Sequence, residues 1–147
     1  MTRAFALTLL LLPAAAAAQS CRVDVVPLAF GVYDPAAAQA NVARGDVTLV
    51  CGGEAGRRSD GGSAAVRLGG EAARALGGNG HSLRYAIFQD AALSRPWWSG
   101  ASFVVALPES TRNGAVELHV PLYGRIAPGQ WIAPGAYQDT IEVTVEF

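Results

Sequence analysis

The sequence contains no lysine, and its eleven basic residues, all arginine, are balanced by twelve acidic residues. The formal net charge is -1, and the longest basic run is the pair Arg57 and Arg58. Proteins that bind nucleic acid concentrate positive charge on one face to neutralise phosphates. The charge balance therefore excludes nucleic acid as an expected partner.

Residues with catalytic chemistry are also scarce, with only two histidines in 147 residues. His81 falls in a predicted hairpin turn and His119 on the solvent side of a predicted strand, and neither has the spacing of a metal site. No serine lies in a Gly-x-Ser-x-Gly elbow. The glycine-rich stretch 52–62 lacks the Gly-Lys-Ser/Thr ending of a phosphate-binding loop, which favours a flexible surface loop. We expect no enzyme activity, no cofactor and no metal.

Long apolar runs are confined to the N-terminus. Residues 4–12 form an apolar run too short to cross a bilayer, and Arg3 and Pro13 flank it. Residues 14–18 are all alanine and offer a small-x-small cleavage site. These features predict a secretory signal peptide over residues 1–18 and a mature domain over residues 19–147. We expect export to the periplasm, followed by a place on the cell surface or secretion.

The chain has two cysteines, Cys21 and Cys51, and both lie in strand-like runs. An even pair in an exported protein is usually a disulfide, because the compartment is oxidising. We therefore predict a clamp between adjacent strands. It would close a loop of about 31 residues, for which chain entropy gives roughly 3.5–4 kcal/mol.

The C-terminal stretch alternates without a break, which is the pattern of a strand with one buried and one solvated face. One face carries Ile141, Val143, Val145 and Phe147, and the other carries Thr140, Glu142, Thr144 and Glu146. A final strand of this kind lies inside a sheet, lies exposed at an edge, or takes a neighbour from another chain.

The rest of the chain also reads as short strands separated by turns, with no amphipathic helix. We expect a hairpin turn at Asn79 and Gly80, and Pro121 indicates a sheet edge or a bulge. The predicted strands cover residues 21–25, 28–33, 46–51, 64–68, 72–76, 82–89, 103–107 and 115–125, while residues 36–43 read as a loop or edge strand. This pattern predicts a single antiparallel β-sandwich with Greek-key connections.

Three aromatic residues outside the strands are candidates for special roles. Trp97 and Trp98 are adjacent, so in an extended segment one packs inward while the other faces solvent. An exposed tryptophan can stack on a sugar or adhere to an apolar surface, whereas a buried one caps the open end of the sandwich. Tyr137 precedes the last strand, where a tyrosine corner and ordinary packing are both open alternatives.

Several blocks of the mature chain together resemble the spore coat protein U domain family, which includes subunits of archaic, Csu-type chaperone–usher pili. The resemblance covers essentially all of the mature chain, and its terminal block is the most specific part. The blocks are Phe30-Gly31-x-Tyr33, Val47 to Cys51, Arg74-Ala-Leu76, Leu83-Arg-Tyr85-Ala-Ile-Phe88, Trp98, Tyr123-Gly-Arg-Ile126, Pro128-Gly-Gln130 and Pro134-Gly-Ala-Tyr137-x-Asp-Thr-Ile-x-Val-x-Val.

The resemblance implies an immunoglobulin-like sandwich that lacks its final strand. In the family a periplasmic chaperone lends a strand, and at an outer-membrane usher the N-terminal extension of the next pilus subunit replaces it. A donor inserting four or five apolar side chains would gain roughly 6–15 kcal/mol, which rivals the stability of a whole domain. The expected donor-strand groove is lined by Val23, Val25, Ile141, Val143, Val145 and Phe147.

One feature departs from the family's major subunits, which carry a donor segment of a dozen or more residues before the first cysteine. Cleavage after Ala18 would leave only Gln19 and Ser20 before Cys21. The sequence thus predicts a subunit that accepts a strand without donating one, at the tip or terminus of a fibre. The alternatives are a secreted spore-coat or matrix protein and a monomeric carbohydrate-binding β-sandwich.

Overall fold

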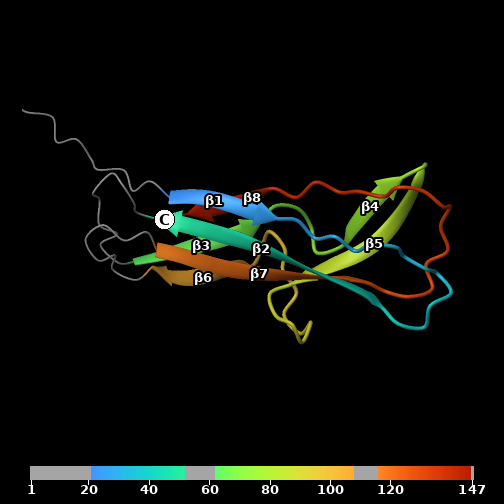
Figure 1. The fold of residues 1–147 in the computed structure, drawn as a ribbon, viewed down its shortest axis with the longest axis horizontal. Coiled ribbons are helices and arrows are strands. Elements are labelled where there is room, and N and C mark those ends of the chain that lie inside the picture. The colour runs from blue at the N-terminus through green and yellow to red at the C-terminus, as the bar shows by residue number, and fades with distance from the viewer. Residues whose placement is uncertain (1–20, 52–61, 108–115, 147) are drawn as a thin grey trace, which may run out of the picture.

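The protein is all-β, and a computed structural model describes residues 21–51, 62–107 and 116–146. Two antiparallel sheets lie against each other (Figure 1), one of five strands in the order β1-β2-β7-β5-β4 and one of three in the order β6-β3-β8. The strands are β1 (Cys21–Val26), β2 (Asn41–Cys51), β3 (Gly62–Leu68), β4 (Arg74–Gly78), β5 (His81–Phe88), β6 (Ser102–Leu107), β7 (Val116–Ile126) and β8 (Val143–Glu146). The predicted sandwich is confirmed. Within these ranges no helix is long and apolar enough to cross a membrane.

The core forms where the inward faces of the two sheets meet, because alternate residues of each strand point to the same side. Each central strand contributes two or more apolar side chains to this core. Its members include Val47, Leu49, Ala64, Val66, Leu68, Leu83, Tyr85, Ile87, Val120, Leu122 and Ile126.

The last strand, β8, lies at an edge and pairs only with β3. Val143 is opposite Leu68 and Val145 is opposite Val66, so the predicted inward valines face the core. The strand begins at Val143 rather than at Ile141, because the chain is still crossing from one sheet to the other before this point. There the carbonyl of Glu142 accepts one bond from the Gly69 amide at 2.8 Å. The predicted place of Phe147 lies outside the described residues.

Strand β7 is central and its register with β2 runs unbroken through Pro121, which corrects the prediction that Pro121 marks a sheet edge or a bulge. Residues 116–126 all pair with β2, whereas β5 pairs only with residues 123–126. Pro121 therefore lies in the half of β7 that has one paired neighbour, where a missing amide donor leaves no second ladder broken. The half of β7 that contains Pro121 tolerates a proline, although β7 itself is a central strand.

The hairpin of β4 and β5 turns at Asn79 and Gly80 as predicted. Both have positive φ, 49° and 75°, the backbone of a tight two-residue hairpin loop. The outer edge of β4 is covered by the C-terminal segment, because Gly77 and Gln138 exchange two backbone hydrogen bonds of 2.8 and 3.0 Å. This edge is therefore closed.

Residues 28–33 form no strand, which corrects the prediction of a second extended strand. After β1 the chain leaves the sheet edge and crosses the inner face of the five-stranded sheet. At Gly124 a Cβ would lie 2.5 Å from the Phe30 ring, so the absence of a side chain permits the crossing. Phe30 then packs edge-on against Tyr85, with ring centroids 5.7 Å apart. Tertiary packing has replaced strand pairing here.

Candidate functional site: an open slot between the first and last strands

A slot opens between the edge strands β1 and β8, and β1 forms its first wall. Val23 is paired with Leu49 and Val25 with Val47, so both valines point to the same side as two fully buried core residues. Nevertheless Val23 is 38% exposed and Val25 is 51% exposed. Inward-pointing valines stay exposed only where nothing covers them, and β1 has a registered neighbour on one side alone.

Strand β8 forms the opposite wall, and Val143 and Val145 face the slot while half-buried. No Cα of β1 lies within 8 Å of a Cα of β8, whereas β6 and β7 approach within that distance on the opposite flank. Strands β1 and β8 belong to different sheets, and stacked sheets pack about 10 Å apart, so this separation is the ordinary spacing of the two layers. On the β1 flank the inward valines of β1 stay exposed, so apolar surface of the sandwich is open to solvent there.

The floor of the slot is the core itself. A cleft of about 150 Å³ opens between the walls. Its floor includes Val47, Leu68, Leu122 and the ring of Tyr85, which are buried side chains of both sheets. The core therefore reaches the surface at this cleft.

A second, wider chamber continues the slot along the long axis. It has a volume of about 680 Å³ and lies between residues 28–35 and residues 132–139. Leu76, Leu83 and Ile126 lie along it. Leu28, Phe30, Leu76 and Asp139 line both chambers, so the two chambers adjoin, and together they are called the groove below. In Figure 1 the segment leading to β8 follows one side of the molecule from the β4–β5 end to β1.

The structure places the predicted groove residues as follows. Val25, Ile141 and Val143 line the narrower chamber. Val23 and Val145 lie further along the two walls and face inward. Leu28, Phe30 and Asp139 also line the groove, although none of them was predicted to do so from the sequence. The alternation of Leu28 and Phe30 was the available signal, whereas a single aspartate beside a strand gives none.

The predicted disulfide is present and clamps this wall. Cys21 and Cys51 are register partners at the start of β1 and the end of β2, with Cα atoms 4.2 Å apart. The bond therefore fixes the edge strand to its one neighbour.

The two adjacent tryptophans point in opposite directions, as predicted. Trp97 is 1% exposed, and its indole N–H donates to the Ala101 carbonyl at 3.1 Å. It packs against Phe103, so it is removed as a possible surface contact. Trp98 is 37% exposed and keeps that possibility. Of the two alternatives left open for Tyr137, the structure favours the corner, since its hydroxyl donates to the Ala133 carbonyl at 2.7 Å.

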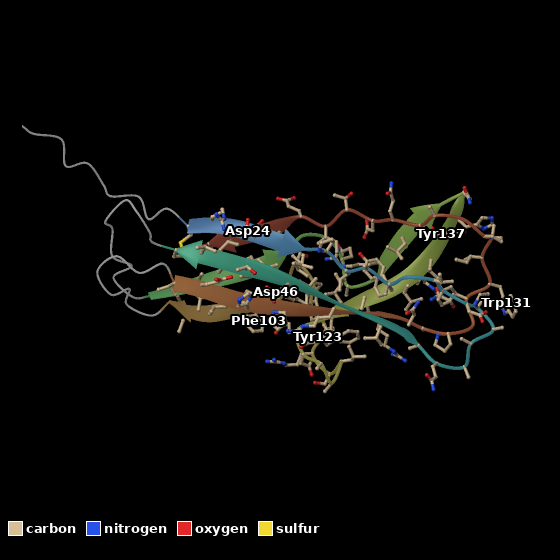
Figure 2. All side chains as sticks on the ribbon, viewed as in Figure 1. Asp24, Asp46, Phe103, Tyr123, Trp131 and Tyr137 are labelled. Carbon is tan, nitrogen blue, oxygen red and sulfur yellow. A yellow bond between two sulfur atoms is a disulfide. The ribbon has the colours of Figure 1, made fainter. Side chains whose placement is uncertain are left out.

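A third tryptophan, Trp131, is 77% exposed and was missed from sequence. Figure 2 shows it at the far end of the long axis. The preceding residue is held firmly: the Gln130 side chain bonds the amide and the carbonyl of Arg84 at 2.9 Å each. The Gln130 amide also donates to the Tyr33 hydroxyl at 2.8 Å. The loop presents the ring on a fixed support.

Charged groups elsewhere lie mainly on the outer faces of the sheets. On β7, His119 donates to Asp46 at 3.0 Å, and this hydrogen bond raises the pKa of His119. Glu117 lies 3.5 Å from the same ring. Across the two sheets and their described connections, no group of three or more His, Cys, Asp or Glu is arranged to hold a metal.

A family model described as the Spore Coat Protein U domain matches residues 5–144. The match includes every strand except the last two residues of β8. No curated protein is similar enough in sequence to count as a match.

Proposed function

The chain belongs to the Spore Coat Protein U domain family, and from this premise we propose that it is a structural subunit of a surface pilus, completed by a β-strand that another chain donates. The family is associated with chaperone–usher pili and spore coats, and its members are structural proteins rather than enzymes. A periplasmic chaperone, an outer-membrane usher and neighbouring subunits are the partners that this function requires.

The observation that carries the proposal is the open flank between β1 and β8. Both walls are edge strands with unpaired backbone groups on the slot side, and both carry inward valines. An added strand could form a ladder with either wall while its alternate side chains enter the apolar chambers.

The free energy that a donated strand would contribute is large compared with the stability of an ordinary domain. Each apolar donor side chain that becomes fully buried contributes roughly 1.5–3 kcal/mol. Val23 and Val25 would also lose their remaining exposure, which adds about one further valine. An occupied slot should therefore stabilise the whole domain, while the empty protein is prone to add strands from unintended chains.

Co-expression with a donor tests the proposal. The oxidised chain should remain in solution and co-purify when a pilus chaperone is present, and Val143→Arg should abolish this because it places a charge in the slot. Thr144→Arg is the matched control, since its side chain points outward on the same strand. Equal recovery of Val143→Arg with the chaperone, or full stability of the wild-type chain alone, would reject a strand-accepting function.

The position of the subunit in a fibre is a separate proposal. If cleavage follows Ala18, the mature chain is an acceptor without a donor segment and belongs at a tip or terminus. Mass spectrometry of the mature N-terminus and immunogold labelling of fibres test this. A longer processed N-terminal segment, or label along the whole shaft, would overturn it.

A second candidate function, carbohydrate binding, is favoured by Trp131. A tryptophan that is 77% exposed on a hydrogen-bonded loop is a preorganised platform for stacking on a sugar ring. A glycan array probed with wild type and Trp131→Ala tests it. Binding that is unchanged in the variant, or absent from wild type, would dismiss this role.

A further inference from the structure

The groove contains one charged side chain at the junction of its two chambers. Among the described residues that line either chamber, Asp139 is the only acidic or basic one, and it lines both. The remaining lining is apolar apart from backbone and a few neutral polar side chains. A lone carboxylate in an apolar groove is a feature that any occupant must accommodate.

Neighbouring groups hold the carboxylate of Asp139 in place. One oxygen, Oδ2, accepts a hydrogen bond from the Tyr85 hydroxyl at 2.6 Å, and Oδ1 accepts from the amide of Thr140 at 2.8 Å. Burial, followed by the bond to Asp139, raises the pKa of Tyr85, so the hydroxyl stays a proton donor. Hydrogen bonds from Tyr85 on β5 and from the adjacent Thr140 amide therefore fix the orientation of the Asp139 side chain.

The charge of Asp139 has no cationic partner in the part of the chain that the structure describes. No arginine or histidine nitrogen lies within 4 Å of its oxygens there, although other carboxylates form such pairs. Arg74 is the register partner of Tyr85, and its guanidinium donates to the Gly69 carbonyl and acts on the tyrosine. Arg74 also lines a surface hollow together with Asp139, Glu71 and Glu142, but it forms no ion pair with Asp139 within 4 Å. A carboxylate accepts up to about four hydrogen bonds, so two sites remain.

A strand in the slot would change the solvation of this carboxylate, because Asp139 is exposed to solvent in the empty protein. A strand that crossed the junction of the two chambers would displace the solvent around Asp139. A carboxylate that loses water without gaining a partner is strongly unfavourable, whereas one that meets a cation or a strong donor is not. Like charge at the same place costs still more.

We propose that Asp139 fixes the register and selects the sequence of the donated strand, by requiring a lysine or arginine at the position that crosses the junction of the two chambers. This inference rests on the proposed strand-accepting function and deepens it. The donor then carries apolar alternate residues on both sides of one cationic residue. If the donated strand shifted by two residues, its apolar side chains would still enter the groove, but its cation would move away from Asp139. The ion pair therefore makes one register bind more tightly than others that apolar contacts alone would not distinguish.

A peptide scan tests the inference on the full oxidised chain. The probes are synthetic 13-residue peptides of alternating valine and threonine, each with one lysine or one glutamate placed at successive positions. Binding is measured by fluorescence polarisation at low salt. We expect one position at which lysine binds about tenfold or more tightly than glutamate, and we expect this preference to shrink at 0.5 M salt.

Matched variants separate register selection from simple support of the fold. Asp139→Asn keeps an oxygen for the Tyr85 hydroxyl but removes the charge, and the lysine preference should fall below about threefold. Glu142→Gln removes a nearby carboxylate that does not line either chamber, and it should leave the preference unchanged. Tyr85→Phe removes the hydrogen bond and should also retain the preference for lysine.

The outcomes distinguish this inference from the function on which it rests. Peptides that bind equally well with lysine and glutamate at every position, or a preference that survives in Asp139→Asn, overturn the register role while the strand-accepting function stands. A preference that does not respond to salt also overturns it, even if the asparagine variant fails to fold. If no peptide binds at all, the strand-accepting function fails and the register role fails with it.

Discussion

Loss of the disulfide should release β1 from the sheet while most of the sandwich stays folded. The perturbation is the double variant Cys21→Ser and Cys51→Ser. Strand β1 touches a registered neighbour on one side only, and five of its six residues are exposed. Without the clamp, little else holds this wall of the slot.

The magnitude follows from the burial of β1. Val23 and Val25 together bury about one valine's worth of apolar surface, which contributes about 1.5–3 kcal/mol. Six residues paired with β2 make about six backbone hydrogen bonds, which contribute about 3–9 kcal/mol in total. Ordering the backbone of six residues costs about 6–12 kcal/mol. The balance is close to zero, so the strand should detach readily once the clamp is gone.

Amide hydrogen exchange measured by NMR checks this prediction. In the variant, the amides of β1 should exchange at least about a hundredfold faster than in the oxidised protein, while those at the centre of β2 and β7 keep most of their protection. Donor peptides should lose affinity as well, because one wall is missing. Equal protection of β1 in the two proteins would refute the reasoning, since β1 would then be held by its own packing.

Three further predictions follow from individual side chains. The pKa of His119 should lie above 6.5 and fall toward that value in Asp46→Asn, as measured by NMR titration. Because the folded-state pKa is raised, the stability that His119 contributes is fully present below pH 6.5 and is lost as pH rises through the raised pKa. Trp97→Ala should lower the free energy of unfolding by about 3–5 kcal/mol in urea denaturation, whereas a similar loss in the exposed control Trp98→Ala would contradict the assigned orientations. Tyr137→Phe should cost about 0.5–1.5 kcal/mol through its lost hydrogen bond, and an unchanged denaturation midpoint would show that the corner is not stabilising.

Local patterns predicted the strands and the clamp, whereas the groove depends on tertiary structure. Period-two alternation located β5, β7 and the second half of β2, and the two cysteines located the disulfide; the first half of β2, from Asn41, was not predicted as part of a central strand. Alternation also identified the inward valines of β1 and β8, since these are set by the pleat. It did not show that residues 28–33 would leave the sheet and become part of a wall, because that depends on packing over Gly124. Trp131 and Asp139 were missed because both lie in non-periodic segments.

The slot between β1 and β8 has a consequence for assembly. Under the proposed strand-accepting function, this slot takes one donated strand per copy. Capture through this slot alone would then extend a fibre without branching.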